Sequence, residues 1–233
     1  MTLKRLGQQE VVFAIFAVLF AVFAIFLPGF ATTQNMLTLL QNVAVLGILG
    51  LAMALIVIGR GIDISLIAAL AVPPGLVLQM VQDGYSLPVS MAAAVALALV
   101  FGLVNGWLIA YAEVPSLFAT LATGIFLAGF GQAVLFKLDV VQWSTGMSGF
   151  EHLGQGTILG IPMPIIAFAV VCVVVAFLLR QTRIGAYFYA IGDNPYGARV
   201  TGIPSRPIIV VQYVLAALIG CFAGFVLAAS VNS

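Results

Sequence analysis

Long apolar runs separated by short polar gaps dominate the chain. Seven runs reach or approach the roughly 20 apolar residues that a membrane-spanning helix requires; they lie at residues 11–28, 38–58, 64–81, 88–111, 115–136, 161–179 and 208–229. The sequence does not show the short alternating segments that are typical of a membrane β-barrel. The pattern therefore predicts an all-α fold, a polytopic transmembrane helical bundle that forms one domain over residues 1–233.

Composition excludes a water-soluble protein. Hydrophobic residues make up 64% of the chain and charged residues only 6%, with a mean hydropathy of +1.25. A soluble domain carries about 25% charged residues. The net charge of +1 provides no basic face for nucleic acid, and the lipid bilayer is the expected surroundings.

The distribution of basic residues predicts the orientation. A cytoplasmic N-terminus places seven of the eight Lys and Arg residues inside, and only Lys137 outside. This is the positive-inside pattern of membrane proteins. Lys4 and Arg5 precede an apolar run that continues to Leu27, which indicates a retained first span rather than a cleaved signal peptide.

The third run is irregular. Pro73 and Pro74 stand in its middle, where they predict a broken helix of the kind that borders transport sites, or else a simple packing kink. Asp63 stands at the cytoplasmic edge of this run, where it either caps the helix together with Ser65 or contacts a transported solute.

A few polar residues fall within or beside the runs and should face the interior of the bundle. They either form interhelical hydrogen bonds or line a passage for a polar solute. The candidate pathway residues are Asn42, Asp63, Ser65, Asn105 and Thr120. Two small-residue ladders, Gly102-x-x-x-Gly106 and Gly220-x-x-x-Gly224-x-x-x-Ala228, predict close helix packing.

The sequence indicates no enzyme chemistry. The phosphate-binding loop Gly-Lys-Ser/Thr, His-Glu-x-x-His and Gly-x-Ser-x-Gly are all missing, so no catalytic residue, metal ligand or cofactor is predicted. Cys172 and Cys221 fall within runs and are expected to be small packing residues. In the outer loop 137–160, Trp143 is expected at the membrane interface and His152 in solvent.

Residues 180–207 form a polar segment between two apolar runs. Asn194-Pro195 predicts a short helix over residues 195–200, with Asn194 as its cap and Pro195 at its first position. Gly192 and Gly202 bracket this helix, and Pro204 and Pro207 are expected to separate it from the last run.

This segment resembles the cytoplasmic loop of sugar-type ABC importer permeases, the ribose/xylose-like branch related to the branched-chain amino acid permeases. The residues that carry the resemblance are Thr182-Arg-x-Gly185-x-x-x-Tyr189-Ala-Ile-Gly192-x-Asn194-x-x-x-Ala198-Arg-x-x-Gly202-Ile. Two further blocks agree in order and spacing. They are Gly61-Ile-Asp63-Ile-Ser65, and Asn105-Gly-x-Leu-Ile-Ala with Val114-Pro115-Ser116-x-x-Ala-Thr120-Leu.

The resemblance implies a permease subunit in the bacterial inner membrane. It would act with a separate ABC ATPase, a second permease subunit (homo- or heterodimer) and a periplasmic substrate-binding protein to import a sugar or similar small polar solute. The ATPase-coupling residues would be Arg183, Gly185, Gly192, Asn194, Ala198, Arg199 and Gly202.

Three positions depart from the family pattern: Arg60, Ala186 and Asp193. Family members also continue for about three more spans, so the chain is expected to lack the C-terminal part of its domain. Two alternatives remain open at this point. One is a stand-alone secondary transporter or channel, and the other is a membrane fragment that transports nothing.

Overall fold

The computed structural model describes residues 7–136, 147 and 150–231. Six helices in this part of the chain are long and apolar enough to cross a membrane: α1 (Gln8–Phe26), α2 (Thr33–Ile58), α4 (Leu87–Ala110), α5 (Ser116–Phe130, extended by the π-helical turn η1, Gly131–Leu135), α7 (Met163–Gln181) and α10 (Ser205–Ser230). The remaining predicted run forms α3 (Leu66–Gln82), which is apolar but has only 17 residues. The all-α prediction is confirmed, with six long helices and one shorter one; the cytoplasmic position of the N-terminus remains a prediction.

The chain divides into two compact units, and residues 1–42 form the first. Within this unit, Phe30 packs against α1, with ring centroids 5.5 Å from Phe20 and 5.6 Å from Phe23. The turn before α2 contains Gly29 at φ +84°, a conformation that favours glycine. Aromatic packing therefore holds Phe30 and the turn that contains Gly29 against α1.

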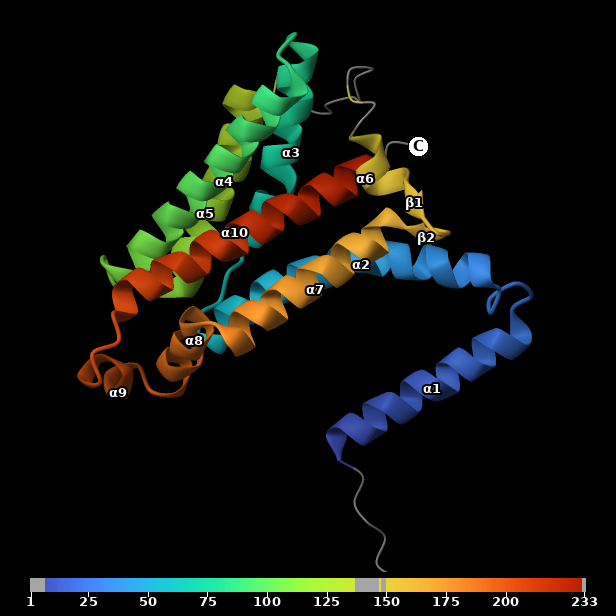
Figure 1. Ribbon diagram of the computed structural model, residues 1–233, viewed down its shortest axis with the longest axis horizontal. Helices are drawn as coiled ribbons and strands as arrows, with labels where there is room; N and C mark the ends of the chain where they lie inside the picture. Colours follow the sequence, from blue (N-terminus) through green and yellow to red (C-terminus); the bar gives the residue numbers. More distant parts are fainter. Residues whose placement is uncertain (1–6, 137–146, 148–149, 232–233) are drawn as a thin grey trace, which may run out of the picture. The chain divides into compact units, whose positions relative to one another are not determined.

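In the second unit, residues 43–233, α10 is the central helix. Figure 1 shows α10 between α3 and α4 on one side and α2 and α7 on the other. On the α2–α7 side, Ala223 and Val226 of α10 are buried against Val45, Ile48 and Ala167. Because α10 has neighbours on both sides, it buries more of its length than the other spanning helices do.

Glycines allow α4 and α10 to approach closely. A Cβ added to Gly102 would lie 2.7 Å from the Cα of Val214, and one added to Gly106 would lie 2.6 Å from the Cα of Val210. The predicted role of this ladder in helix packing is confirmed. Larger residues at either position would force the two backbones apart.

The prediction that the prolines break the third helix is wrong, because α3 is continuous through Pro73 and Pro74. Pro74 has no N–H to donate to the carbonyl of Leu70. That carbonyl instead faces Gly224 of α10 so closely that a Cβ there would collide with it. Small residues of α10 therefore accommodate the carbonyl that a proline leaves free, and Gly224 belongs to the second predicted ladder.

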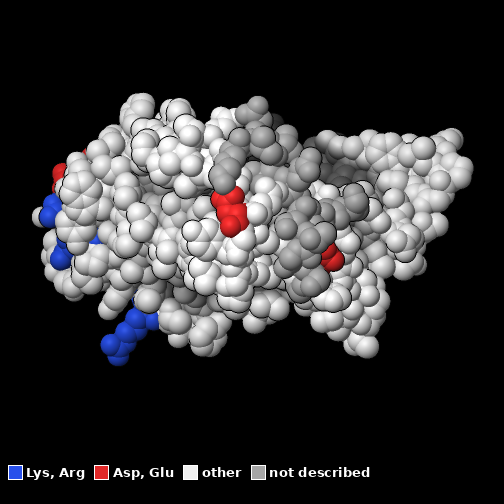
Figure 2. Space-filling view, turned by 90° about the horizontal axis from the view of Figure 1, so that it is seen from above, with Lys and Arg blue, Asp and Glu red and all other residues white. Residues whose placement is uncertain are grey.

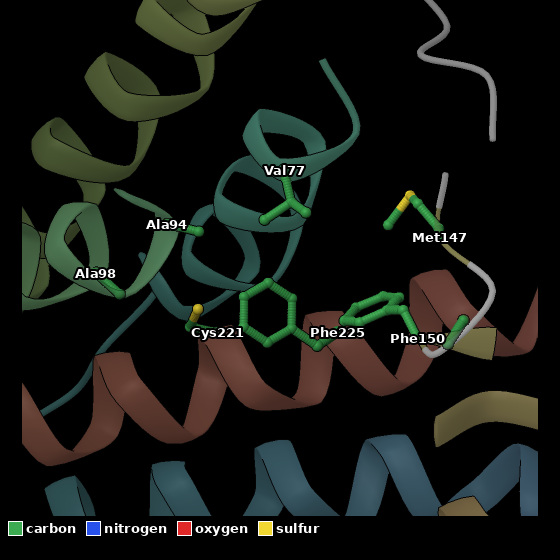
Figure 3. Close-up of a cluster of buried hydrophobic side chains, with 8 residues drawn as sticks. Val77, Ala94, Ala98, Met147, Phe150, Cys221 and Phe225 are labelled. Atoms are coloured by element: carbon green, nitrogen blue, oxygen red, sulfur yellow. The ribbon is translucent and has the colours of Figure 1, made fainter. Parts of the chain in front are cut away.

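The same C-terminal half of α10 also packs into an apolar cluster (Figure 3). Phe225 of α10 meets Phe150 edge to face, with ring centroids 5.7 Å apart, and Val77, Ala94 and Cys221 complete the contact. Cys221 is buried and unpaired, as expected for a packing residue, whereas Cys172 is only half-buried.

The predicted outer loop contains more structure than expected. Residues 150–162 form α6 (Glu151–Gln155) and an antiparallel pair of two-residue strands, β1 (Thr157–Ile158) and β2 (Ile161–Pro162). Leu159 and Gly160 both have positive φ, the conformation that a tight hairpin turn requires. His152 lies exposed in α6, while Trp143 is outside the described residues.

Candidate functional site

The polar segment after α7 folds into two helices rather than a loop with one. α8 spans Arg183–Asp193, and its first turn is capped by Thr182, whose hydroxyl accepts a hydrogen bond from the N–H of Gly185 at 3.2 Å. The sequence analysis missed this helix. Its signal was the spacing of Ile184, Tyr187, Phe188 and Ile191, which places four apolar side chains on one helical face.

The predicted short helix is present as α9, Pro195–Val200. The side chain of Asn194 accepts a hydrogen bond from the N–H of Gly197 at 2.9 Å, and Pro195 occupies the first helical position. Gly202 follows at φ +85° and lets the chain turn into α10, which begins at Ser205. Pro204 precedes α10, as expected, but Pro207 lies inside its first turn.

The seven residues predicted for ATPase coupling separate into two groups. Gly185 and Ala198 are buried and Gly192 is half-buried, whereas Arg183, Asn194, Arg199 and Gly202 are exposed. A Cβ on Gly185 would collide with the carbonyl of Leu178, so this glycine serves the close turn between α7 and α8. Only the exposed group can touch another protein directly.

The outer surface of α8 and α9 carries large apolar side chains. Tyr196 is 78% exposed, Val200 70% and Tyr189 51%. Tyr196 and Val200 are one helical turn apart, with Arg199 beside Val200. Arginine side chains gather at the end of the second unit where α8 and α9 lie, while most of the face shown in Figure 2 is uncharged. We call Tyr189, Tyr196, Arg199 and Val200 the α8–α9 surface.

The end of α8 is fixed to the turn between α2 and α3. A Cβ on Gly192 would collide with the carbonyl oxygen of Ile58, so no other residue fits there without movement. Nη2 of Arg60 donates a hydrogen bond to the carbonyl of Asp193 at 2.9 Å, although Arg60 has φ +63°. Two of the three departures from the family pattern, Arg60 and Asp193, thus contact each other, and they link α8 to the segment that contains Asp63.

Asp63 and Ser65 begin a buried chain of hydrogen bonds at the start of α3. Oδ1 of Asp63 accepts hydrogen bonds from the N–H of Ser65 at 2.9 Å and from the Ser65 hydroxyl. The bond from the Ser65 N–H forms a turn over residues 63–65 that leads into α3, and the N-cap residue Ser65 makes no side-chain cap hydrogen bond of its own. Burial raises the pKa of the Asp63 carboxyl, which precedes the spanning helix, and the hydrogen bonds from Ser65 act in the opposite direction.

Asn105 of α4 continues this chain to α5. Its Nδ2 donates to the Ser65 hydroxyl at 2.8 Å, and its Oδ1 accepts from the Thr123 hydroxyl at 2.5 Å. The hydroxyl of Thr120 accepts from the N–H of Ile64 at 3.2 Å. The hydroxyl of Ser116 accepts from the N–H of Ile62 at 3.1 Å. Two helices, α4 and α5, and the segment before α3 are therefore joined by side-chain hydrogen bonds.

We call Asp63, Ser65, Asn105, Thr120 and Thr123 the polar cluster. Four of the five predicted pathway residues belong to it, and the fifth, Asn42, lies exposed in α2 outside it. Thr123 and Ser116 were not among the site predictions, although their spacing of three and four residues from Thr120 places them on the same face of α5. Asp63, Ser65, Asn105 and Thr120 each expose 5% or less, so a solute cannot touch them in this conformation.

The hydroxyl of Tyr213 in α10 lies near this cluster and has no hydrogen-bond partner among the described residues. It faces Gly61, where a Cβ would lie 2.6 Å from the oxygen. The described residues contain no group of three or more His, Cys, Asp or Glu that could hold a metal ion.

Comparison with known proteins agrees with the geometry. A family model described as "Branched-chain amino acid transport system / permease component" matches residues 35–233. The ribose import permease protein of Escherichia coli K12 is 30% identical over 210 residues, which cover 88% of this chain and 64% of that protein. The corresponding protein of Bacillus subtilis 168 is 32% identical over 206 residues, with the same two coverages.

The autoinducer 2 import system permease protein of Shigella flexneri is 30% identical over 224 residues, or 94% of this chain and 64% of that protein. The chain thus spans just under two thirds of the length of these curated relatives. No solved structure matches it.

Proposed function

Because the chain belongs to the family of permease components of branched-chain amino acid transport systems, we propose that it is the membrane-spanning permease subunit of an ATP-binding-cassette importer. Relatives named for the import of ribose and of autoinducer 2 favour a sugar or a similar small polar solute. The direction of transport is into the cytoplasm, across the bacterial inner membrane.

The observation that carries this proposal is the α8–α9 surface. Aromatic residues and arginine provide most of the binding energy at protein interfaces, and Tyr196 and Arg199 stand exposed together on α9. The inner side of the same segment is fixed to the bundle through Gly192 and Arg60. A protein that binds α9 can therefore move the start of α3 through a short, direct path.

The partners follow from this arrangement. A separate ABC ATPase binds the α8–α9 surface, since this sequence has no phosphate-binding loop of its own. A second permease subunit completes the passage, and a periplasmic binding protein delivers the solute to the outer side. Transport then alternates between two states, while the polar cluster joins α4 and α5 to the start of α3.

The test is uptake of labelled solute by proteoliposomes that contain the chain with and without an ABC ATPase and a substrate-binding protein that copurify with it. We expect uptake only with ATP and the ATPase present. Uptake without the ATPase would instead indicate a stand-alone secondary transporter or channel. No uptake with a complete and folded complex would contradict both functions.

A further inference from the structure

We propose that α4 and α10 form a binding site for an anionic phospholipid, with its acyl chain in an apolar groove and its phosphate group at Arg199 and Arg206. The groove has a volume of about 820 Å³, within the range of about 300–1,000 Å³ that is usual for ligand pockets. It is lined by Leu103, Val104, Trp107, Leu108, Tyr111, Pro207, Val210 and Val211.

A polar hollow continues this groove at one end. It has a volume of about 350 Å³, includes Arg199, Ser205 and Arg206, and shares Tyr111 and Pro207 with the groove. An apolar channel that leads directly into a basic hollow fits one kind of molecule, an amphiphile with a long hydrocarbon chain and an anionic head. Basic pockets beside spanning helices on the cytoplasmic side are suited to anionic lipid head groups.

The aromatic residues place the junction at the membrane surface. Tyr111, which is 44% exposed, lines both the groove and the hollow, and Trp107, which is 56% exposed, lines the groove one helical turn away. Tryptophan and tyrosine favour the level of the lipid head groups. By the positive-inside prediction this is the inner leaflet.

The charges around the hollow favour the binding of an anion. Arg206 forms an ion pair with Glu113 at 2.9 Å and lies over the ring of Tyr111, 5.6 Å from its centroid. Arg199 is exposed and is not paired with Glu113. Two guanidinium groups against one carboxylate give a net positive charge, and Glu113 competes with a phosphate for Arg206.

Trp107 provides a direct probe. A Trp143→Phe background leaves it as the single tryptophan, since the chain has two. The full chain is reconstituted in phosphatidylcholine vesicles that contain brominated phosphatidylglycerol or, at equal fraction, brominated phosphatidylcholine. We expect stronger quenching by the anionic lipid, corresponding to a relative binding constant at least about fivefold higher, the value for one arginine near a membrane surface.

Variants test the head-group assignment. Arg199→Gln and Arg206→Gln should each lower this preference about fivefold. Arg180→Gln, an exposed arginine at the end of α7, should leave it unchanged. Glu113→Gln should raise the preference because it frees Arg206, a change that no merely structural role of Glu113 would produce.

Three outcomes would overturn the proposal. Equal quenching by both lipids would mean that ordinary bilayer lipid fills the groove. Absence of quenching by either lipid would mean that protein covers it, such as a second permease subunit. A preference that survives both arginine substitutions would place the anionic head elsewhere.

Discussion

The polar cluster and the α8–α9 surface both interrupt apolar sequence, but the side chains of the cluster are mostly buried, whereas those of the surface are exposed. In the cluster, Asn105 uses its amide to bind Ser65 and Thr123, and little of the group is exposed. On α9, the apolar groups of Tyr196 and Val200 are exposed, on the surface that we propose binds the ATPase. The difference teaches that polarity in a spanning segment can serve the assembly of helices, whereas exposed apolar groups on a polar segment indicate binding.

The largest effect on stability should come from a substitution of Gly192, a half-buried residue at the end of α8. Gly192→Ala is expected to destabilise the protein by about 3 kcal/mol or more, because the added Cβ meets the backbone carbonyl of Ile58. Folded yield and thermal unfolding in detergent measure this effect. Gly129→Ala in α5 is the matched control, since a Cβ there has nothing within 4 Å. Equal behaviour of the two variants would contradict the packing described at Gly192.

Asn105→Leu should have the next largest effect on stability. It removes two buried hydrogen bonds, to the Ser65 and Thr123 hydroxyls, at a cost of about 1–3 kcal/mol, while uptake per folded molecule changes little. Asn42→Leu, at an exposed position of α2, should be close to neutral. Unfolding curves and uptake, both normalised to folded protein, separate the two effects. A loss of uptake at unchanged stability would instead place Asn105 in the pathway.

The double variant Tyr196→Ala/Val200→Ala should weaken binding of the ATPase and leave the fold intact. Loss of an interface anchor costs about 2 kcal/mol or more, so the amount of ATPase that copurifies should fall at least about tenfold. Tyr85→Ala, at a tyrosine that is 57% exposed between α3 and α4, should leave copurification unchanged. Unaltered ATPase binding by the double variant would remove the α8–α9 surface from the proposed function.

The smallest effect concerns Arg60, which joins the two regions. Arg60→Ala removes the donor to the Asp193 carbonyl at the end of α8 and should destabilise by about 0.3–1 kcal/mol. Arg60→Gly should be closer to neutral, because glycine adopts φ +63° without a side-chain penalty. Melting temperatures of the pair test this order. The reverse order would mean that the turn changes shape when the arginine is absent.

Local signals in the sequence were sufficient where a structure depends on neighbouring residues. Asn194 and Pro195 predicted the position of α9, since a cap and a first-turn proline act within one helical turn. Local signals failed where contacts with residues far away in the sequence determine the structure. The continuity of α3 depends on Gly224, and the partners of Asn105 include Ser65, 40 residues away. The helix α8 was not predicted because Arg183, Gly185 and Gly192 make the spacing of its apolar residues hard to recognise.

The fit of α3 against α10 has a consequence for biosynthesis. The chain leaves the ribosome with α3 already made, but Gly224, which receives the carbonyl that Pro74 leaves free, is synthesised only after α9. Until then α3, short and interrupted in its bonding, has to be sheltered by the insertion machinery or by α4. The packing of α3 is therefore complete only after α10 has been synthesised. In a chain stalled before Ser205, α3 would lack this packing and would be open to cleavage by membrane proteases.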